Sequence, residues 1–246
     1  MRRAFRPLVL CYHRVSTAEP HRLAVSAEQL EAHLRGLVRR RYSPALAEDI
    51  VPGRHRLFHV TFDDAYTSVA EALPVLERLA VPGTAFVCSA FAEDGRPLRV
   101  PELESAVDAA PSEFATMRWD ELRALAERGI EIGSHTISHP HLPRLGDAEL
   151  NRELRESRER IADELGRECR YLAYPYGDED ARVREAARRA GYDAAFALPG
   201  SGYSVDRFGL PRIDLYWKDT GFRAALKLSP LRGGRCRFAC ALRMTR

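Results

Sequence analysis

The chain has 246 residues, of which 45% are apolar and 30% are charged, and its formal net charge is +3. This length suits one large α/β domain whose core is big enough to fold without disulfides. The composition is typical of soluble globular proteins, and so small a net charge gives no support for a nucleic-acid partner. No apolar run in the sequence is long enough to span a membrane.

The two ends of the chain are basic. The first apolar run covers only residues 8–12, too short for the core of a signal peptide, so a cytoplasmic location is the default expectation and export by another route stays open. Residues 218–246 contain eight Lys or Arg and one acid, Asp219. We therefore expect a single domain over residues 1–217 and a basic tail over residues 218–246. This tail is predicted either to be solvated or to touch an acidic membrane surface or glycan peripherally.

Apolar runs alternate with helical patterns along the chain. A capping box at Ser26 and Gln29 opens the first helix, and Gly129 and Gly166 end later ones. In chain order, the expected elements are a strand at 8–12, a helix from 27, a strand at 57–60, a helix ended by Pro82-Gly83, a strand at 84–88, a helix around 119–125, a strand at 130–132, a long helix capped by Asp147 and stopped at Gly166, a strand at 171–174, a helix through 190 and a strand at 194–198. Repeated strand–helix units with apolar strands predict a parallel sheet, either open or closed into a barrel.

Two groups of polar residues follow the ends of separate strands. Asp63 and Asp64 come after the strand that leads to Thr61, and His135 and His139 come after the strand at 130–132. The carboxyl ends of parallel strands meet at one edge, where α/β folds collect their active sites, so these side chains are expected to converge. The irregular segment 91–116 is expected to pass over this site.

The chemistry of these residues points to a metal hydrolase. Two imidazoles and one carboxylate form a mixed ligand set for Zn²⁺ or another divalent transition metal, with a position left for water or substrate. The second carboxylate is then free to act as a base. Each motif is weak when taken alone, and the alternative is a pair of helix-capping acids and two surface histidines.

Three motifs in order make the sequence resemble the polysaccharide deacetylase family, also called the NodB-homology family of carbohydrate esterases. They are Thr-Phe-Asp-Asp at 61–64, Ser-His-Thr-x-x-His at 134–139 and Tyr-Pro-Tyr-Gly at 174–177. The resemblance covers about residues 8–215. It implies a deformed (β/α) barrel in a single domain and metal-dependent hydrolysis of the carbon–nitrogen amide bond of N-acetylated sugars.

The same resemblance assigns roles residue by residue. It implies Asp63 as the general base, and Asp64, His135 and His139 as metal ligands. It also implies that the backbone N–H of Tyr176 donates to the oxyanion of the tetrahedral intermediate.

The sequence departs from the family pattern where a proton must reach the departing amine. No histidine occurs after His141, so the usual C-terminal leucine-x-histidine motif is absent. The first strand instead leads into Cys-Tyr-His-Arg-Val at 11–15, which resembles the poly-N-acetylglucosamine deacetylase branch. If the barrel closes, the first strand lies beside the last, and His13 occupies the place of the missing histidine. The alternative is a histidine that only lines the sugar pocket.

A second departure concerns Ala173. Many members of the family carry an arginine at this position, paired with the catalytic base. Without a cation, two adjacent carboxylates raise each other's pKa unless the metal charge suffices. Arg212 is the candidate replacement, and a surface arginine is the equally weighted alternative. Of the remaining histidines, His21, His33 and His55 are predicted to face solvent.

The sequence thus favours an enzyme that removes acetate from an N-acetylated oligo- or polysaccharide, in the metabolism of a surface or extracellular polysaccharide. Two other functions stay open at this stage. One is an amidohydrolase of a small cyclic amide metabolite on the same fold. The other is a carbohydrate-binding relic with a damaged site, which the missing C-terminal histidine favours and the four motif residues Asp63, Asp64, His135 and His139 disfavour.

Overall fold

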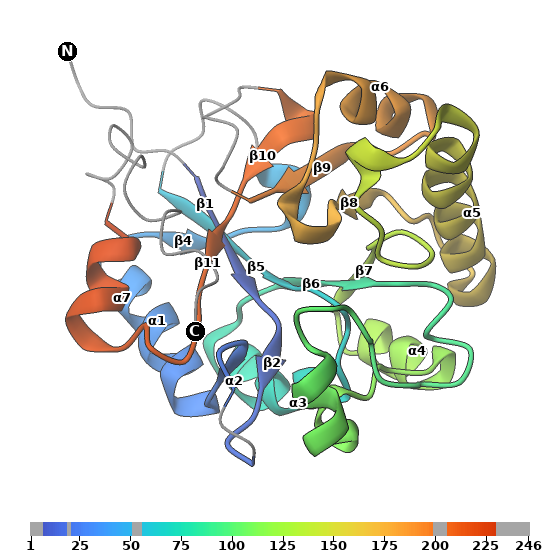
Figure 1. Cartoon of the computed structure of the whole chain (residues 1–246). Coiled ribbons are helices and arrows are strands. Elements are labelled where there is room, and N and C mark those ends of the chain that lie inside the picture. The colour runs from blue at the N-terminus through green and yellow to red at the C-terminus, as the bar shows by residue number, and fades with distance from the viewer. Residues whose placement is uncertain (1–6, 19–20, 51–55, 199–205, 230–246) are drawn as a thin grey trace.

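A computed structural model of the chain describes residues 7–18, 21–50, 56–198 and 206–229 (Figure 1). Its main feature is a sheet of nine parallel strands, ordered β10-β9-β8-β7-β6-β5-β1-β11 with β4 beside β5. These strands are β1 (Leu8–Tyr12), β4 (Ser43–Pro44), β5 (Leu57–Phe62), β6 (Gly83–Val87), β7 (Glu131–Ser134), β8 (Tyr171–Ala173), β9 (Ala194–Ala197), β10 (Leu210–Pro211) and β11 (Ile213–Asp214). A separate pair consists of β2 (Arg14–Val15) and β3 (Ala24–Val25).

The sheet closes on itself because its two edge strands come from one short segment. β10 pairs with β9 and β11 pairs with β1, and only Arg212 separates β10 from β11. The segment 210–214 therefore joins the two edges of the sheet. The result is a nearly closed barrel of parallel strands with helices outside it, which confirms the predicted deformed (β/α) barrel.

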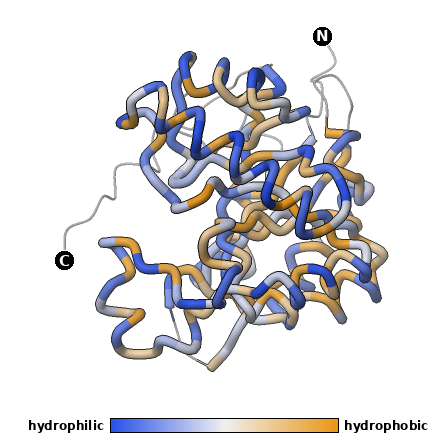
Figure 2. The backbone as a smooth tube through the Cα atoms, turned by 90° about the vertical axis from the view of Figure 1, so that its right-hand side faces the viewer, coloured by the Kyte–Doolittle hydropathy of each residue, from blue (hydrophilic) through white to orange (hydrophobic). Residues whose placement is uncertain are grey.

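Seven α-helices of the described residues surround the strands. They are α1 (Ala27–Arg39), α2 (Leu73–Leu79), α3 (Glu104–Ala109), α4 (Trp119–Glu127), α5 (Asp147–Leu165), α6 (Ala181–Arg189) and α7 (Gly221–Lys227). The predicted capping box is present, because Ser26 accepts from the backbone N–H of Gln29 and Gln29 accepts from that of Ser26. Figure 2 shows hydrophilic and hydrophobic residues alternating along these helices, as expected for helices with one face on the sheet and one toward solvent.

Side chains alternate along the strands between two buried layers. Leu10, Val60 and Leu172 belong to the larger apolar cluster, which also contains the inward faces of the helices. The strand residues that alternate with them, such as Val9 next to Leu10 and Tyr171 next to Leu172, belong to a smaller cluster. This cluster has no α-helical members and consists of Val9, Ala45, Ala47, Ile50, Phe86, Tyr171, Ala173, Ala194, Phe196 and Leu210. This smaller cluster is the barrel interior, which the loop at 45–50 contributes to. By the same alternation, Cys11, His135 and Arg212 face the interior.

A glycine in β7 makes room inside the barrel. A Cβ at Gly133 would lie 2.5 Å from the ring of Phe86, a fully buried member of the interior cluster. Gly133 stands two residues before His135 and so faces the same side of the strand. Phe86 therefore fills the barrel directly below that histidine.

The segment 91–116 packs beside the end of the barrel where the polar motifs lie. Its residues Leu98, Val107 and Phe114 form a third apolar cluster, against which Tyr176 and Tyr216 pack. Glu113 of this segment forms an ion pair with Arg14, which is fully buried on β2. The predicted excursion thus lies next to the site, and it contains helix α3 in addition to irregular turns.

The first residues of the expected basic tail are part of the folded body. Residues 221–227 form α7, and Arg40 at the end of α1 donates to the carbonyl of Ala225 at 3.2 Å. Residues 230–246 lie outside the described part of the chain. Among the described helices, none combines the length and the apolar character that crossing a membrane requires.

Candidate active site

The two aspartates stand at the carboxyl end of β5, where the backbone leaves the strand abruptly. Asp64 and Ala65 have φ values of +66° and +46°, in the left-handed region that only a few non-glycine residues adopt. Asp63 is 2% exposed and Asp64 is 4% exposed. The turn directs two successive carboxylates toward the site, and the rest of the fold must hold its strained backbone in place.

The loop after β7 carries the two histidines, and its backbone is strained in the same way. Thr136 and His139 have φ values of +72° and +63°. The carboxylate of Glu153, 2% exposed on α5, accepts from the backbone N–H groups of Ile137 at 2.8 Å and Ser138 at 3.1 Å. It also accepts from the hydroxyl of Ser138 at 2.8 Å. A buried carboxylate therefore fixes the loop that joins His135 to His139.

Asp64, His135 and His139 come together as the sequence predicts. The Nε2 atoms of both histidines lie 3.5 Å from Oδ1 of Asp64, and one ligand atom from each residue lies within 4.8 Å of the others. The imidazole of His135 is further oriented by its Nδ1, which lies 2.8 Å from the carbonyl oxygen of Ala173. Because a carbonyl only accepts, Nδ1 carries the proton, and the lone pair of Nε2 points toward Asp64.

Arg212 is buried in the barrel and pairs with Asp63, so the predicted contact is confirmed and the surface alternative is wrong. Its Nη1 donates to Oδ1 of Asp63 at 2.5 Å and its Nη2 to Oδ2 at 2.8 Å. Burial alone raises the pKa of Asp63, but the guanidinium more than offsets this effect and holds the pKa well below its usual range. Asp63 is therefore ionised while fully enclosed, as a general base requires.

Asp64 has no such partner. Burial and the neighbouring charge of Asp63 raise the pKa of Asp64 to about 8. Its Oδ1 is buried and has no hydrogen-bond partner among the described residues. Burial lowers the pKa of His135 to about 4, and burial beside a second imidazole, that of His135, lowers the pKa of His139 well below 6.5, so both imidazoles are neutral near pH 7.

This donor set fits a divalent transition-metal ion. It consists of one carboxylate without a cationic partner and two neutral imidazoles, all more than nine-tenths buried. These are the ligand types that Zn²⁺ and similar ions require, and the two imidazoles are already neutral. The raised pKa of Asp64 means that an ion binding there would displace a proton from this carboxyl group. The second carboxylate, Asp63, is paired with Arg212, and its Oδ2 lies 4.0 Å from Nε2 of His135.

Tyr176 lies beside His139 and His141. Its ring packs edge-on against His139 with centroids 4.5 Å apart, and it stacks on His141 at 3.9 Å. Its φ is +60°, so this residue shares the strained backbone of the other loops at the site. The position agrees with a role at the reacting centre, whereas donation by its N–H to an oxyanion stays a prediction.

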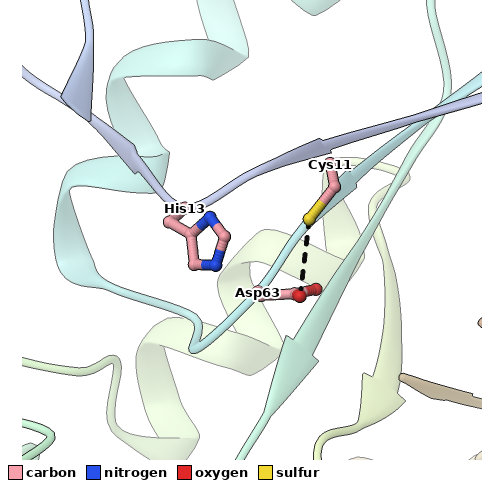
Figure 3. Close-up of side chains that lie close together, drawn as sticks. All are labelled: Cys11, His13 and Asp63. Carbon is pink, nitrogen blue, oxygen red and sulfur yellow. Dashed lines mark hydrogen bonds between the residues drawn. The ribbon is translucent and has the colours of Figure 1, made fainter. Parts of the chain in front are cut away.

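His13 lies on the other side of Asp63. It follows β1, half-buried, with its ring stacked on Tyr216 at 6.4 Å. One ring nitrogen of His13, the thiol of Cys11 and one oxygen of Asp63 lie within 4.8 Å of one another (Figure 3). Burial lowers the pKa of His13 from 6.5, and the charge of Asp63 partly offsets this effect. His13 is therefore placed for proton transfer but neutral near pH 7.

Two contributors to this site were absent from the sequence-based prediction. Glu153 holds the histidine loop, and the only signal was an acid on the same helical face as Leu150 and Leu154. Cys11 donates its thiol hydrogen to Oδ2 of Asp63 at 3.4 Å, although its apolar surroundings in the sequence indicated only core packing.

One prediction outside the site was wrong. His33 does not face solvent: it is 4% exposed and contacts the hydroxyl of Tyr12 at 3.1 Å and the carbonyl oxygen of Asp219 at 2.6 Å. His21 is partly buried, and His55 lies outside the described residues.

Comparisons with known proteins agree with this geometry. The family "Polysaccharide deacetylase" matches residues 51–195. The protein YxkH of Bacillus subtilis (strain 168), provisionally named a polysaccharide deacetylase, is 25% identical over 216 residues, which cover 83% of this chain and 70% of YxkH.

Two solved structures show the same fold. The Streptococcus pyogenes deacetylase PplD, in complex with acetate, has a TM-score of 0.73 at 18% identity, covering 92% of this chain and 100% of PplD. IcaB from Ammonifex degensii has a TM-score of 0.70 at 24% identity, covering 92% of this chain and 98% of IcaB.

Proposed function

The chain belongs to the polysaccharide deacetylase family, hydrolases of N-acetyl amide bonds, and from this premise we propose that it is a metal-dependent enzyme that removes acetyl groups from an N-acetylated glycan. The observation that carries the proposal is the pair of adjacent aspartates in two different electrostatic environments. The negative charge of Asp63 is balanced by the guanidinium of Arg212, whereas Asp64 faces two neutral imidazoles. Asp63 is thus kept ionised until it takes a proton from the attacking water, and Asp64, which has no positive partner of its own, would gain one from a bound cation.

Asp64, His135 and His139 would hold the ion, which is proposed to be Zn²⁺ or another divalent transition metal. A divalent ion bound there supplies the positive charge that polarises the acetyl carbonyl of the substrate. Glu153 and the carbonyl of Ala173 keep the ligands in position, because they fix the loop and the ring orientation of His135.

Asp63 acts as the general base. It accepts a proton from the attacking water, and Arg212 keeps it both ionised and oriented before that step. The backbone N–H of Tyr176 donates to the oxygen on which negative charge develops. The carbon–nitrogen bond then breaks, and the products are acetate and an amine.

His13 delivers the proton that the amine needs. Because His13 is neutral near pH 7, it must first receive a proton, and the one that Asp63 has taken from water lies closest. A transfer from Asp63 through His13 to the departing nitrogen keeps the proton balance within the site. His13 thereby takes the place of the histidine missing after His141.

The substrate proposed is an oligo- or polysaccharide with N-acetylated sugars, in surface or extracellular polysaccharide metabolism. The sequence at 11–15 and the position of His13 beside Asp63 support the poly-N-acetylglucosamine branch of the family. A cytoplasmic location and peripheral membrane contact by the basic tail stay proposals that rest on the sequence, whereas α7 extends the folded body past the domain end expected near residue 217.

The direct test is acetate release from a panel of N-acetylated oligosaccharides. We expect activity that disappears on chelation and returns when Zn²⁺ or another divalent transition metal is added. Full activity in the presence of a chelator would contradict the role of the metal. Activity restricted to small cyclic amides, with none on any oligosaccharide, would contradict the substrate.

A further inference from the structure

A second cluster of metal-binding side chains lies next to the first. Cys11, His13 and Asp63 each offer one ligand atom, and these atoms lie within 4.8 Å of one another. The thiol of Cys11 is already in contact with Oδ2 of Asp63, at 3.4 Å. Figure 3 shows the three side chains turned toward a common space between β1 and β5. None of the three belongs to the Asp64, His135 and His139 set.

The donor atoms of this cluster are free to take a cation. The Nδ1 atom of His13 is buried and has no hydrogen-bond partner among the described residues. Arg212 approaches Asp63 through its two terminal nitrogens, one for each oxygen, so Oδ1 keeps a further lone pair. The further lone pair of Oδ2 accepts from the thiol of Cys11 and becomes free when that thiol loses its hydrogen. A thiolate, an imidazole and a carboxylate together favour a borderline or soft ion such as Zn²⁺ or Cd²⁺ over Mg²⁺ or Ca²⁺.

The guanidinium of Arg212 sets the strength of this second site. Its positive charge lies against Asp63 and repels a second cation, so binding must be weaker than at Asp64, His135 and His139. Binding is possible because the thiol can contribute a negative charge: the S–H bond of Cys11 breaks, a sulfur–metal bond forms and the proton leaves to solvent. Asp214, half-buried near Arg212, adds a further acid to the same region.

We propose that Cys11, His13 and Asp63 form a second, inhibitory cation site for thiophilic divalent ions. An ion there occupies the lone pair of Asp63 and the imidazole of His13, so neither can handle a proton. The inhibitory part rests on the proposed function, whereas the existence of the site does not. The enzyme is accordingly activated by the first equivalent of Zn²⁺ and inhibited by an excess of Zn²⁺ or by Cd²⁺.

The site is tested by titrating the Zn²⁺-loaded protein with Cd²⁺ and recording the ultraviolet sulfur-to-cadmium charge-transfer absorption. Cys236 and Cys240 lie outside the described residues, and both are replaced by serine in the parent protein so that they cannot contribute. Cadmium that displaces zinc from Asp64, His135 and His139 gives no such band, because that set contains no sulfur. We expect a band that saturates at one sulfur-bound Cd²⁺ per chain.

The matched variants are Cys11→Ala and Cys169→Ala, since both thiols are buried and Cys169 is not in either cluster. Cys11→Ala should abolish the band and Cys169→Ala should keep it. Cys11→Ser, nearly equal in volume to the native residue, gives the same answer if Cys11→Ala fails to fold. A band that survives in the folded Cys11 variants, or no band in the parent, overturns the site.

Inhibition is measured separately, relative to the uninhibited rate of each variant. Loss of one of three ligands should raise the concentration of Cd²⁺ or excess Zn²⁺ needed for half-inhibition by about tenfold or more. A Cys11-dependent band without Cys11-dependent inhibition keeps the cation site but overturns its inhibitory role, and it also counts against Asp63 and His13 as the proton-handling residues. Failure of the cation site and failure of the proposed proton-handling function therefore give different results.

Discussion

The two halves of the site are built in different ways. The half that would bind metal comes from two short motifs that follow the strands on either side of β6, Asp64 after β5 and His135 and His139 after β7. The half that handles protons is assembled from distant parts of the chain: Asp63 pairs with Arg212, which is 149 residues away, and lies beside His13 from the first strand. The first half depends on local loop geometry, whereas the second depends on closure of the barrel.

This difference separates what each kind of mutation should do. Changes in the first half should remove the metal and leave the barrel intact. Changes in the second half should leave the metal in place and alter the pH dependence or the substrate dependence of the rate. The experiments below test that separation.

The largest effect is expected from removing a metal ligand. Asp64→Ala, His135→Ala and His139→Ala should each release the ion and abolish turnover, because three protein ligands leave none to spare. Elemental analysis of the purified variants measures this directly. A His139→Ala protein that keeps one equivalent of metal would show that His139 is not a ligand.

Asp63→Asn should keep the metal but release acetate much more slowly. The amide preserves the shape of the side chain but cannot accept a proton from water, and general-base catalysis typically contributes about 10²–10⁴-fold. Metal content and acetate release are measured on the same preparation. If Asp63→Asn is isolated without metal, the roles assigned to the two aspartates are exchanged.

His13→Ala should slow amide substrates by about 10²-fold or more, since the leaving amine then lacks its proton donor. Activated aryl acetate esters, whose leaving groups need no proton, should be affected much less. The ratio of the two rates is the measurement, and Tyr216→Phe, which keeps the ring stacked on His13, serves as the control. Equal losses on both substrates would indicate that His13 binds or positions the sugar.

Arg212→Met should move the acidic limb of the pH–rate profile upward. The guanidinium lowers the pKa of Asp63, and activity requires the ionised base, so removing the guanidinium means that protonation inactivates the enzyme at a higher pH. An opposite charge at this distance typically lowers a carboxylate pKa by about 1–3 units. Ala173→Arg in the same variant should recover part of the shift, because residue 173 also belongs to the barrel interior. If the acidic limb of the pH–rate profile does not move, the charge of the metal, and not Arg212, keeps Asp63 ionised.

The smallest effect is expected at Glu153. Glu153→Gln retains the volume but removes one acceptor oxygen and the charge, so at least one of its three hydrogen bonds to the histidine loop is lost. Residues that orient metal ligands typically change metal affinity by about 10–100-fold. Competition with a chromophoric chelator measures this change, and Glu156→Gln on the exposed face of α5 is the matched control. Equal affinities in the two variants would reduce Glu153 to a packing role.

The sequence predicted the fold and the convergence of its motifs because both follow from local patterns. Apolar runs indicated where the strands lie. Because the strands are parallel, polar residues that directly follow them all lie at the same end of the barrel. The orientation of Arg212 could not be decided in this way, since it stands between β10 and β11 and its direction depends on which strands each of them joins. His33 was misjudged for a similar reason, because its partner Asp219 lies 186 residues away.

Arg212 also links the order of folding to the onset of activity. The residue that keeps the base ionised is the one that lies between the two edges of the sheet, so Asp63 stays unpaired until the last strand has joined the first. Domains begin to fold from the N-terminus while the chain is being synthesised, and the metal ligands emerge long before residue 212. A growing chain would therefore contain all three proposed metal ligands before it contains Arg212, and the proposed base would gain its cationic partner only when the barrel closes.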